Sequence, residues 1–314
     1  MKRELSRLVA GQICLHACMT GMRMASPLMA LREGYSEAAV GLLLAMFALT
    51  QVFLALPAGR FVDRHGIQPS LRIGITMACS GALLAVIWPM YPVLCVSALL
   101  TGGATGAVII ALQRHVGRMA ENPVALRSAF SWLSVGPAAS NFVGPLLAGL
   151  LIDHAGFEWA YAAMAALPLV AWLWIRQAHE LPKVIKPEGH EKNSAWDLLN
   201  EPMFRRLLLV NWFLSACWDV HTFVVPILGH ERGLSASAIG SILGGFAIAA
   251  AFIRLMMPFV AARLQEWQVI TGAMLITSCM LAVYPFTDTA WLMGCCSVLL
   301  GLSLGGVQPM VMST

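Results

Sequence analysis

The sequence predicts an all-α polytopic membrane protein, and two observations support this fold class: its composition and the lengths of its apolar runs. Hydrophobic residues make up 59% of the chain and charged residues only 11%, whereas a soluble domain carries about 25% charged residues. This balance excludes a water-soluble globule. A helix satisfies its own backbone polar groups and can therefore cross a bilayer, so we expect the apolar runs to be transmembrane helices.

Ten apolar runs follow one another along the chain, each close to the length of about 20 residues that a bilayer-crossing helix needs. They lie at 6–30, 38–58, 72–90, 92–112, 126–152, 158–176, 205–228, 237–258, 268–286 and 290–312. A stretch rich in Lys, Glu and Pro separates the sixth run from the seventh. We therefore predict an N-terminal six-helix bundle at 1–176, a cytoplasmic linker at 177–206, and an incomplete C-terminal bundle of four helices at 207–314.

The distribution of basic residues predicts the orientation of the chain. If the N-terminus is cytoplasmic, most of the 20 Lys and Arg residues fall in cytoplasmic segments, and the outer loops hold only Arg32 and Arg232. Basic residues are enriched in cytoplasmic loops, so we expect a multi-pass protein with a cytoplasmic N-terminus. The net charge of +4 then follows from these loops, and we expect the lipid bilayer, and no nucleic acid, as a partner.

The chain contains an internal repeat at an offset of 199 residues. Six positions carry the same Gly, Pro or Ser residue in both copies. The pairs are Pro27 and Pro226, Gly34 and Gly233, Ser36 and Ser235, Gly41 and Gly240, Gly102 and Gly301, and Gly106 and Gly305. We therefore expect two pseudo-repeated helix bundles. Counterparts of the fifth and sixth runs do not follow the tenth, so ten of an expected twelve transmembrane helices are present, and we expect the C-terminal bundle to be truncated.

The connection between the second and third runs carries a charged motif, and we expect a tight turn there. It resembles the loop between helices two and three of the major facilitator superfamily (MFS), whose pattern is roughly Gly-x-Leu-Ala-Asp-Arg-x-Gly-Arg-Arg. The matching residues are Gly59, Asp63, Arg64 and Gly66. Ile67 and Gln68 occupy the places that the family usually gives to basic residues. The resemblance implies a gating loop and the MFS fold, in which two six-helix halves enclose a central site.

The fifth run contains two Gly-Pro pairs, which kink a helix and leave space beside it. The run resembles the antiporter signature of the same family, Gly-x-x-x-Gly-Pro-x-x-Gly-Gly. The residues concerned are Gly136, Pro137, Gly144, Pro145 and Gly149. Ser140 replaces the first Gly, and Gly149 is displaced by one position. The resemblance implies export of a solute in exchange for protons, by a protein of a bacterial-type inner (plasma) membrane.

Ionisable groups inside transmembrane spans are costly, and each is a candidate for function. The candidates for substrate binding or proton coupling are Asp219, Arg23, His221 and His16. Asp219 is the preferred proton carrier, with a static partner role as the alternative. Arg23 is a candidate contact for an anionic substrate or for Asp219. Asp219 and His221 are two residues apart and should lie on different faces of one helix.

These features predict a secondary active transporter of a small solute that works by alternating access, coupled to protons and acting in export. One alternative is an uptake permease for a small organic anion or metabolite. Another is a non-transporting membrane protein or a degraded gene fragment. We expect no enzyme activity and no cofactor. The eight Cys residues form no Cys-x-x-Cys pair, so we expect no metal site.

Overall fold

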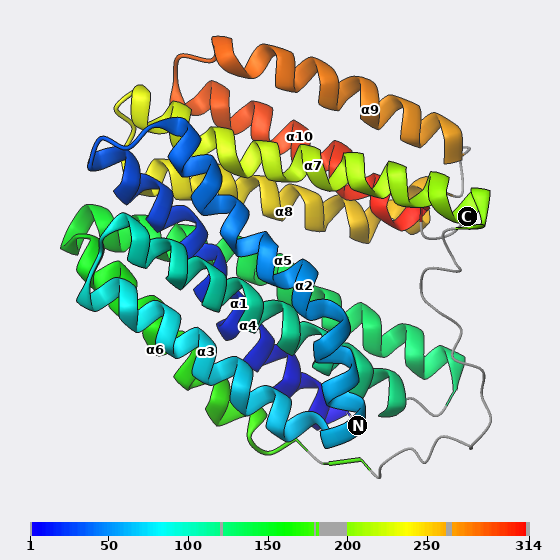
Figure 1. The fold of residues 1–314 in the computed structure, drawn as a ribbon. Helices are drawn as coiled ribbons and strands as arrows, with labels where there is room; N and C mark the ends of the chain where they lie inside the picture. Colours follow the sequence, from blue (N-terminus) through cyan, green and yellow to red (C-terminus); the bar gives the residue numbers. More distant parts are fainter. Residues whose placement is uncertain (1, 120–121, 179, 182–199, 262–265, 312–314) are drawn as a thin grey trace. The chain divides into compact units, whose positions relative to one another are not determined.

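The computed structural model describes residues 2–119, 122–178, 180–181, 200–261 and 266–311. These residues form α-helices joined by short turns (Figure 1). The elements are α1 (Lys2–Arg32), α2 (Glu37–His65), α3 (Ile67–Ile87), α4 (Tyr91–Met119), α5 (Pro123–Ala155), α6 (Phe157–Ile175), α7 (Pro202–Glu231), α8 (Ala236–Ala261), α9 (Glu266–Val283), the 3-10 turn η2 (Tyr284–Phe286) and α10 (Ala290–Val311). A helix lies at each of the ten predicted runs, which confirms the all-α fold class.

Eight of the helices in the described ranges, α2 to α9, are long and apolar enough to cross a membrane. A shorter apolar helix, Ala290–Gly306, lies within α10. α1 has 31 residues but is less apolar, because Gln12, His16 and Arg23 interrupt it. The chain is a multi-span membrane protein.

The chain divides into two compact units. Unit 1 comprises residues 1–183 and 225–244, and unit 2 comprises residues 184–224 and 245–314. Most of the predicted linker, at 182–199, lies outside the described residues. The predicted domain boundaries at 176 and 206 therefore stay predictions.

Unit 1 is organised around α1 and α4. α1 packs against α5 and α6, while α4 packs against α2 and α3. The buried core between them is aliphatic, and includes Leu8, Val62, Leu71, Val108 and Leu112. Large apolar side chains such as Leu56 and Trp159 lie on the outer surface instead, exposed by 57% and 65%. An apolar outer surface is expected for helices that face lipid.

Unit 2 contains the packed pair α9 and α10. Ala273 of α9 is buried against apolar side chains of α7 and α9, which are Leu207, Val210, Leu214 and Ile270. The hydroxyl groups of Thr277 and Ser303 lie 2.9 Å apart and link α9 to α10.

The internal repeat is visible in local geometry. Gly34 after α1 and Gly233 after α7 both adopt a positive φ, of 82° and 66°, which favours glycine. In both copies the next Ser caps the following helix. The hydroxyl groups of Ser36 and Ser235 each accept a hydrogen bond from the backbone N–H of the residue three positions later, at 3.3 Å and 3.2 Å. Serine is a preferred N-cap because it satisfies an otherwise unpaired helix donor.

The repeat also extends to helix packing within each unit. A Cβ atom added to Gly102 in unit 1 would overlap the carbonyl oxygen of Phe47. A Cβ atom added to Gly301 in unit 2 would overlap the carbonyl oxygen of Phe246. Phe47 and Phe246 are themselves 199 residues apart. The same close approach of two helix backbones therefore recurs in both halves, which confirms the predicted pseudo-repeat.

Candidate functional site

The charged motif lies at the C-terminal end of α2, next to α4. The structure corrects one expectation, because the turn itself is a single residue and Gly59, Asp63 and Arg64 belong to α2. Gly66 alone joins the helices, with φ at 88°, and its N–H donates to the carbonyl of Val62. α2 therefore continues through His65 and ends at Gly66, because a glycine readily takes the positive φ found at this position.

An ion pair joins this motif to α4. The carboxylate of Asp63 contacts the guanidinium of Arg114. Gly59, one turn earlier on α2, lies beneath the same guanidinium, and a Cβ atom there would approach it to 3.2 Å. Arg64 is exposed. Gly59 and Asp63 therefore both face Arg114 of α4, and Gly66 lines the same small pocket as Asp63 and Arg114.

The antiporter-like motif of α5 presents its small residues to α1. A Cβ atom on Gly136 would meet the side-chain amide of Gln12 at 2.7 Å, and one on Gly144 would overlap Thr20. The Ser140 hydroxyl lies 2.7 Å from the carbonyl of Gly136 and 3.0 Å from that of Ile13. Thr20 in turn donates to the carbonyl of Ser140, at 2.9 Å. Ser140, which departs from the family pattern, thus forms a polar link between the two helices.

The other end of the motif meets the first turn of α8, within unit 1. A Cβ atom on Gly149 would overlap the backbone of Ala236. One turn later, the carboxylate of Asp153 accepts the N–H groups of Ala236 and Ser237, at 2.9 Å and 2.7 Å. A carboxylate stabilises a helix N-terminus because it pairs with unsatisfied N–H donors. Pro137 and Pro145 both lie inside α5.

The ionisable candidates on α1 differ in burial. His16 is only 8% exposed, and its Nδ1 has no hydrogen-bond partner among the described residues. Arg23 is partly buried two turns further along α1. Arg23 belongs to unit 1 and Asp219 to unit 2, so their predicted pairing stays a prediction.

The two candidates on α7 lie on different faces, as predicted. Asp219 is exposed, whereas His221 is only 1% exposed. The His221 ring stacks on Phe246 of α8, with ring centroids 4.2 Å apart. Its Nε2 lies 2.9 Å from the Ser297 hydroxyl of α10, which also lies 2.9 Å from the Tyr284 hydroxyl. His221, Ser297 and Tyr284 therefore form a buried polar cluster in unit 2.

Sequence reasoning missed Ser297, Tyr284 and Phe246 as partners of His221. They are separated from it by 76, 63 and 25 residues, and none is charged. The described residues contain no group of three His, Cys, Asp or Glu side chains that could hold a metal ion.

Comparisons with known proteins agree with this architecture. The family model of the Major Facilitator Superfamily matches residues 8–314. The chain is 29% identical over 202 residues to the inner membrane transport protein YajR of Escherichia coli (strain K12). The aligned region covers 62% of this chain and 43% of that protein. It is 25% identical over 232 residues to multidrug resistance protein 1 of Bacillus subtilis (strain 168), with coverages of 71% and 57%. These matches span about half the length of both relatives.

A longer match is with the class E tetracycline resistance protein of Escherichia coli, at 28% identity over 297 residues, or 88% of this chain and 70% of that protein. Among solved structures, the nucleoside transporter NupG superposes with a TM-score of 0.76. The superposition covers 98% of this chain and 81% of that one at 13% identity, so it supports the fold alone. Because the family model covers nearly the whole sequence, the chain belongs to the Major Facilitator Superfamily.

Proposed function

We propose that this protein is a secondary active transporter of the inner membrane, which exports a small solute in exchange for protons by alternating access. The observation that carries the proposal is the antiporter-like face of α5, where Gly136, Ser140 and Gly144 lie directly against α1. Relatives named for tetracycline and multidrug resistance support export. In this proposal the N-terminus is cytoplasmic, and residues 177–206 link the two halves.

Four residues are proposed to serve coupling or substrate binding. Asp219 is the proposed proton carrier, since an intramembrane carboxyl group can take up and release a proton as access alternates between the two sides. Arg23 is proposed to contact the substrate or Asp219. His16 and His221 are secondary candidates, and the enclosed setting of His221 favours a structural role for it.

The first experiment tests proton-coupled export in inside-out membrane vesicles with an acidified interior. Tetracycline serves as the first probe because of the resistance proteins among the relatives. We expect tetracycline to accumulate inside the vesicles and the interior pH to rise as protons leave. Asp219→Asn should abolish both signals while the amount of protein in the membrane is unchanged, and Asp288→Asn is the matched control at an exposed carboxylate. Undiminished uphill transport by Asp219→Asn would refute the coupling role.

A second candidate function is uptake of a small organic anion. The guanidinium of Arg23, partly buried on α1, favours it, because a cation inside a span attracts an anionic group. The direction of transport separates the two functions. Accumulation of a labelled organic anion in right-side-out vesicles, with none in inside-out vesicles, supports uptake.

A further inference from the structure

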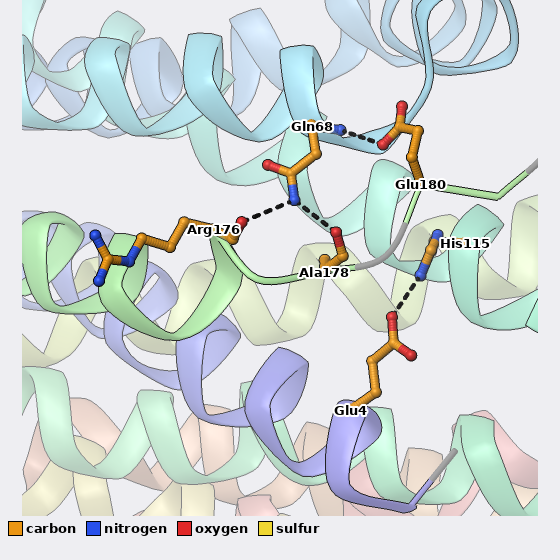
Figure 2. Close-up of polar contacts among 6 residues, drawn as sticks. All are labelled: Glu4, Gln68, His115, Arg176, Ala178 and Glu180. Atoms are coloured by element: carbon orange, nitrogen blue, oxygen red, sulfur yellow. Dashed lines mark hydrogen bonds and ion pairs between the residues drawn. The ribbon is translucent and has the colours of Figure 1, made fainter.

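The chain that follows α6 is fastened to the turn between α2 and α3. We call its described residues, Arg176, Gln177, Ala178, Glu180 and Leu181, the strap. The side-chain amide of Gln68 donates to the backbone carbonyls of Arg176 and Ala178, at 3.2 Å and 2.7 Å. Figure 2 shows this amide between the two carbonyls, close to the end of α6. One side chain of α3 thus holds two backbone groups of the strap.

Glu180 makes the reciprocal contact. Its carboxylate accepts the backbone N–H of Gln68 in the first turn of α3, at 3.3 Å (Figure 2). The N-cap of α3 is Gly66, which has no side chain with which to cap the helix. A carboxylate near unpaired N–H groups stabilises a helix N-terminus, so Glu180 replaces the missing cap from a distant part of the sequence.

Gly66 is required for this contact as well as for the turn. A Cβ atom at Gly66 would overlap the carboxylate of Glu180. The φ of 88° at this residue separately disfavours any side chain. The same glycine therefore ends α2 and leaves the space that Glu180 fills.

The strap adjoins the ion pair of the charged motif. Leu181 lines a small pocket together with residues of α2, α3 and α4, which are Val62, Asp63, Gly66, Ile67, Arg114, His115 and Arg118. On the α4 side of this pocket, His115 Nε2 lies 3.4 Å from the carboxylate of Glu4 in α1 (Figure 2). The strap thus touches the place in unit 1 where the Asp63–Arg114 ion pair links α2 to α4.

We propose that Gln68 and Glu180 are positioning residues for the transport cycle: they fasten the strap to the N-terminus of α3 and so hold the Asp63–Arg114 ion pair in place. A force transmitted along the chain from beyond Leu181 would then act on the turn between α2 and α3, and not on the end of α6. This role rests on the proposed transport function. The attachment of the strap to α3 does not rest on the transport function, and it can be measured separately.

The fastening is tested by trypsin digestion of inside-out vesicles. The bond after Arg176 is a trypsin site, and its carbonyl is one of the two acceptors of Gln68. Gln68→Glu keeps the shape of the side chain but removes the donor of both hydrogen bonds. Its carboxylate would repel the two carbonyl oxygens and the carboxylate of Glu180. We therefore expect cleavage after Arg176 to become at least about tenfold faster. Gln68→Arg retains donors and should keep the bond protected. Gln177→Ala changes an exposed strap residue and is the matched control.

The positioning role is tested by transport in the same vesicles. We expect Gln68→Glu and Glu180→Gln to lower the maximal rate of transport about tenfold per molecule with the KM unchanged, and Gln68→Arg to restore it. In an Asp63→Asn background, Glu180→Gln should have little further effect. A purely structural cap would lower the amount of folded protein but leave the rate per molecule unchanged.

Three outcomes overturn the proposal, and they are distinguishable. Unchanged cleavage after Arg176 in Gln68→Glu refutes the fastening. Faster cleavage with a transport rate equal to that of Gln177→Ala refutes the positioning role. If the unmodified protein transports no probe in either direction, the proposed function fails and the positioning role falls with it, while the cleavage rates still decide whether the strap is fastened.

Discussion

Within the described residues, the imidazole of His221 has one hydrogen-bond partner from another helix, the hydroxyl group of Ser297. It is enclosed between Phe246 and Tyr284, whose ring centroids lie 4.2 Å and 5.9 Å from its own. Nδ1 is buried with no hydrogen-bond partner in the described part of the chain, and Nε2 pairs with the hydroxyl group of Ser297. A buried polar group that loses its partner costs about 1–3 kcal/mol. The stability of unit 2 should therefore be sensitive to Ser297.

Replacing Ser297 tests this dependence. We expect Ser297→Ala to lower the free energy of unfolding by about 1–3 kcal/mol, because Nε2 of His221 then loses its bond to Ser297 and stays buried. The measurement is the apparent melting temperature of the detergent-solubilised protein. Ser215→Ala, at an exposed position of α7, is the matched control. Equal melting temperatures for the two variants would show that the Ser297 contact contributes nothing to stability.

The contact between α1 and α5 depends on glycines of α5, which have no side chain. A Cβ atom at Gly144 would lie 2.7 Å from the carbonyl of Ala17 and 2.9 Å from the backbone N of Gly21. Both are backbone atoms, so a side-chain rotation cannot relieve the overlap. We expect Gly144→Ala to cost about 1–3 kcal/mol through overpacking, and to lower transport because α1 and α5 are forced apart.

The matched control for Gly144→Ala is another helical glycine, Gly272 of α9, where an added Cβ atom meets nothing within 4 Å. Alanine is favoured over glycine in a helix by up to about 1 kcal/mol, so Gly272→Ala should be neutral or stabilising. Melting temperatures measured in the same detergent compare the two. A Gly144→Ala protein as stable as Gly272→Ala would mean that the helices adjust without cost.

The elements themselves were predictable because their signals are local. Each apolar run predicted its helix, and the offset of 199 residues predicted two related halves, which the paired turns at Gly34 and Gly233 and the paired close contacts at Gly102 and Gly301 bear out. The turn at Gly66 was only partly predicted. Charged residues from Arg60 to His65 suggested a loop, but they continue α2 beyond the apolar run, because charge does not end a helix.

For the whole molecule, hydropathy and repetition predicted the fold, whereas the polar contacts of the site were not predictable from sequence. Asp63 was identified from its motif, but its partner Arg114 lies 51 residues away among several other arginines. Gln68 was noted only as a departure from the family pattern, and its contacts with the strap depend on where α6 ends in space. Local patterns specify which residues are unusual, and the packing of distant helices determines their partners.

The orientation of the whole chain gives a last prediction, because six helices, α2 to α7, separate the repeat-related turns at Gly34 and Gly233. If each of the six crosses the membrane, both turns lie on the same side. Because basic residues are enriched in cytoplasmic loops, Arg60, Arg64 and Arg72 lead us to expect the turn at Gly66 on the cytoplasmic side. Alkaline phosphatase, which needs the oxidising periplasm for its disulfides, should therefore be active when fused after Gly34 or Gly233. The same enzyme fused after Gly66 is the control and should be inactive.

Opposite results at Gly34 and Gly233 would mean that one of the helices α2 to α7 does not span the membrane. The two halves would then be inverted repeats and not parallel ones, and this result would contradict the parallel arrangement implied by the family resemblance. Activity at Gly66 with none at Gly34 and Gly233 would keep the parallel repeat but reverse the whole chain. The strap and the Asp63–Arg114 ion pair would then lie on the outer side, where trypsin would reach Arg176 only in right-side-out vesicles.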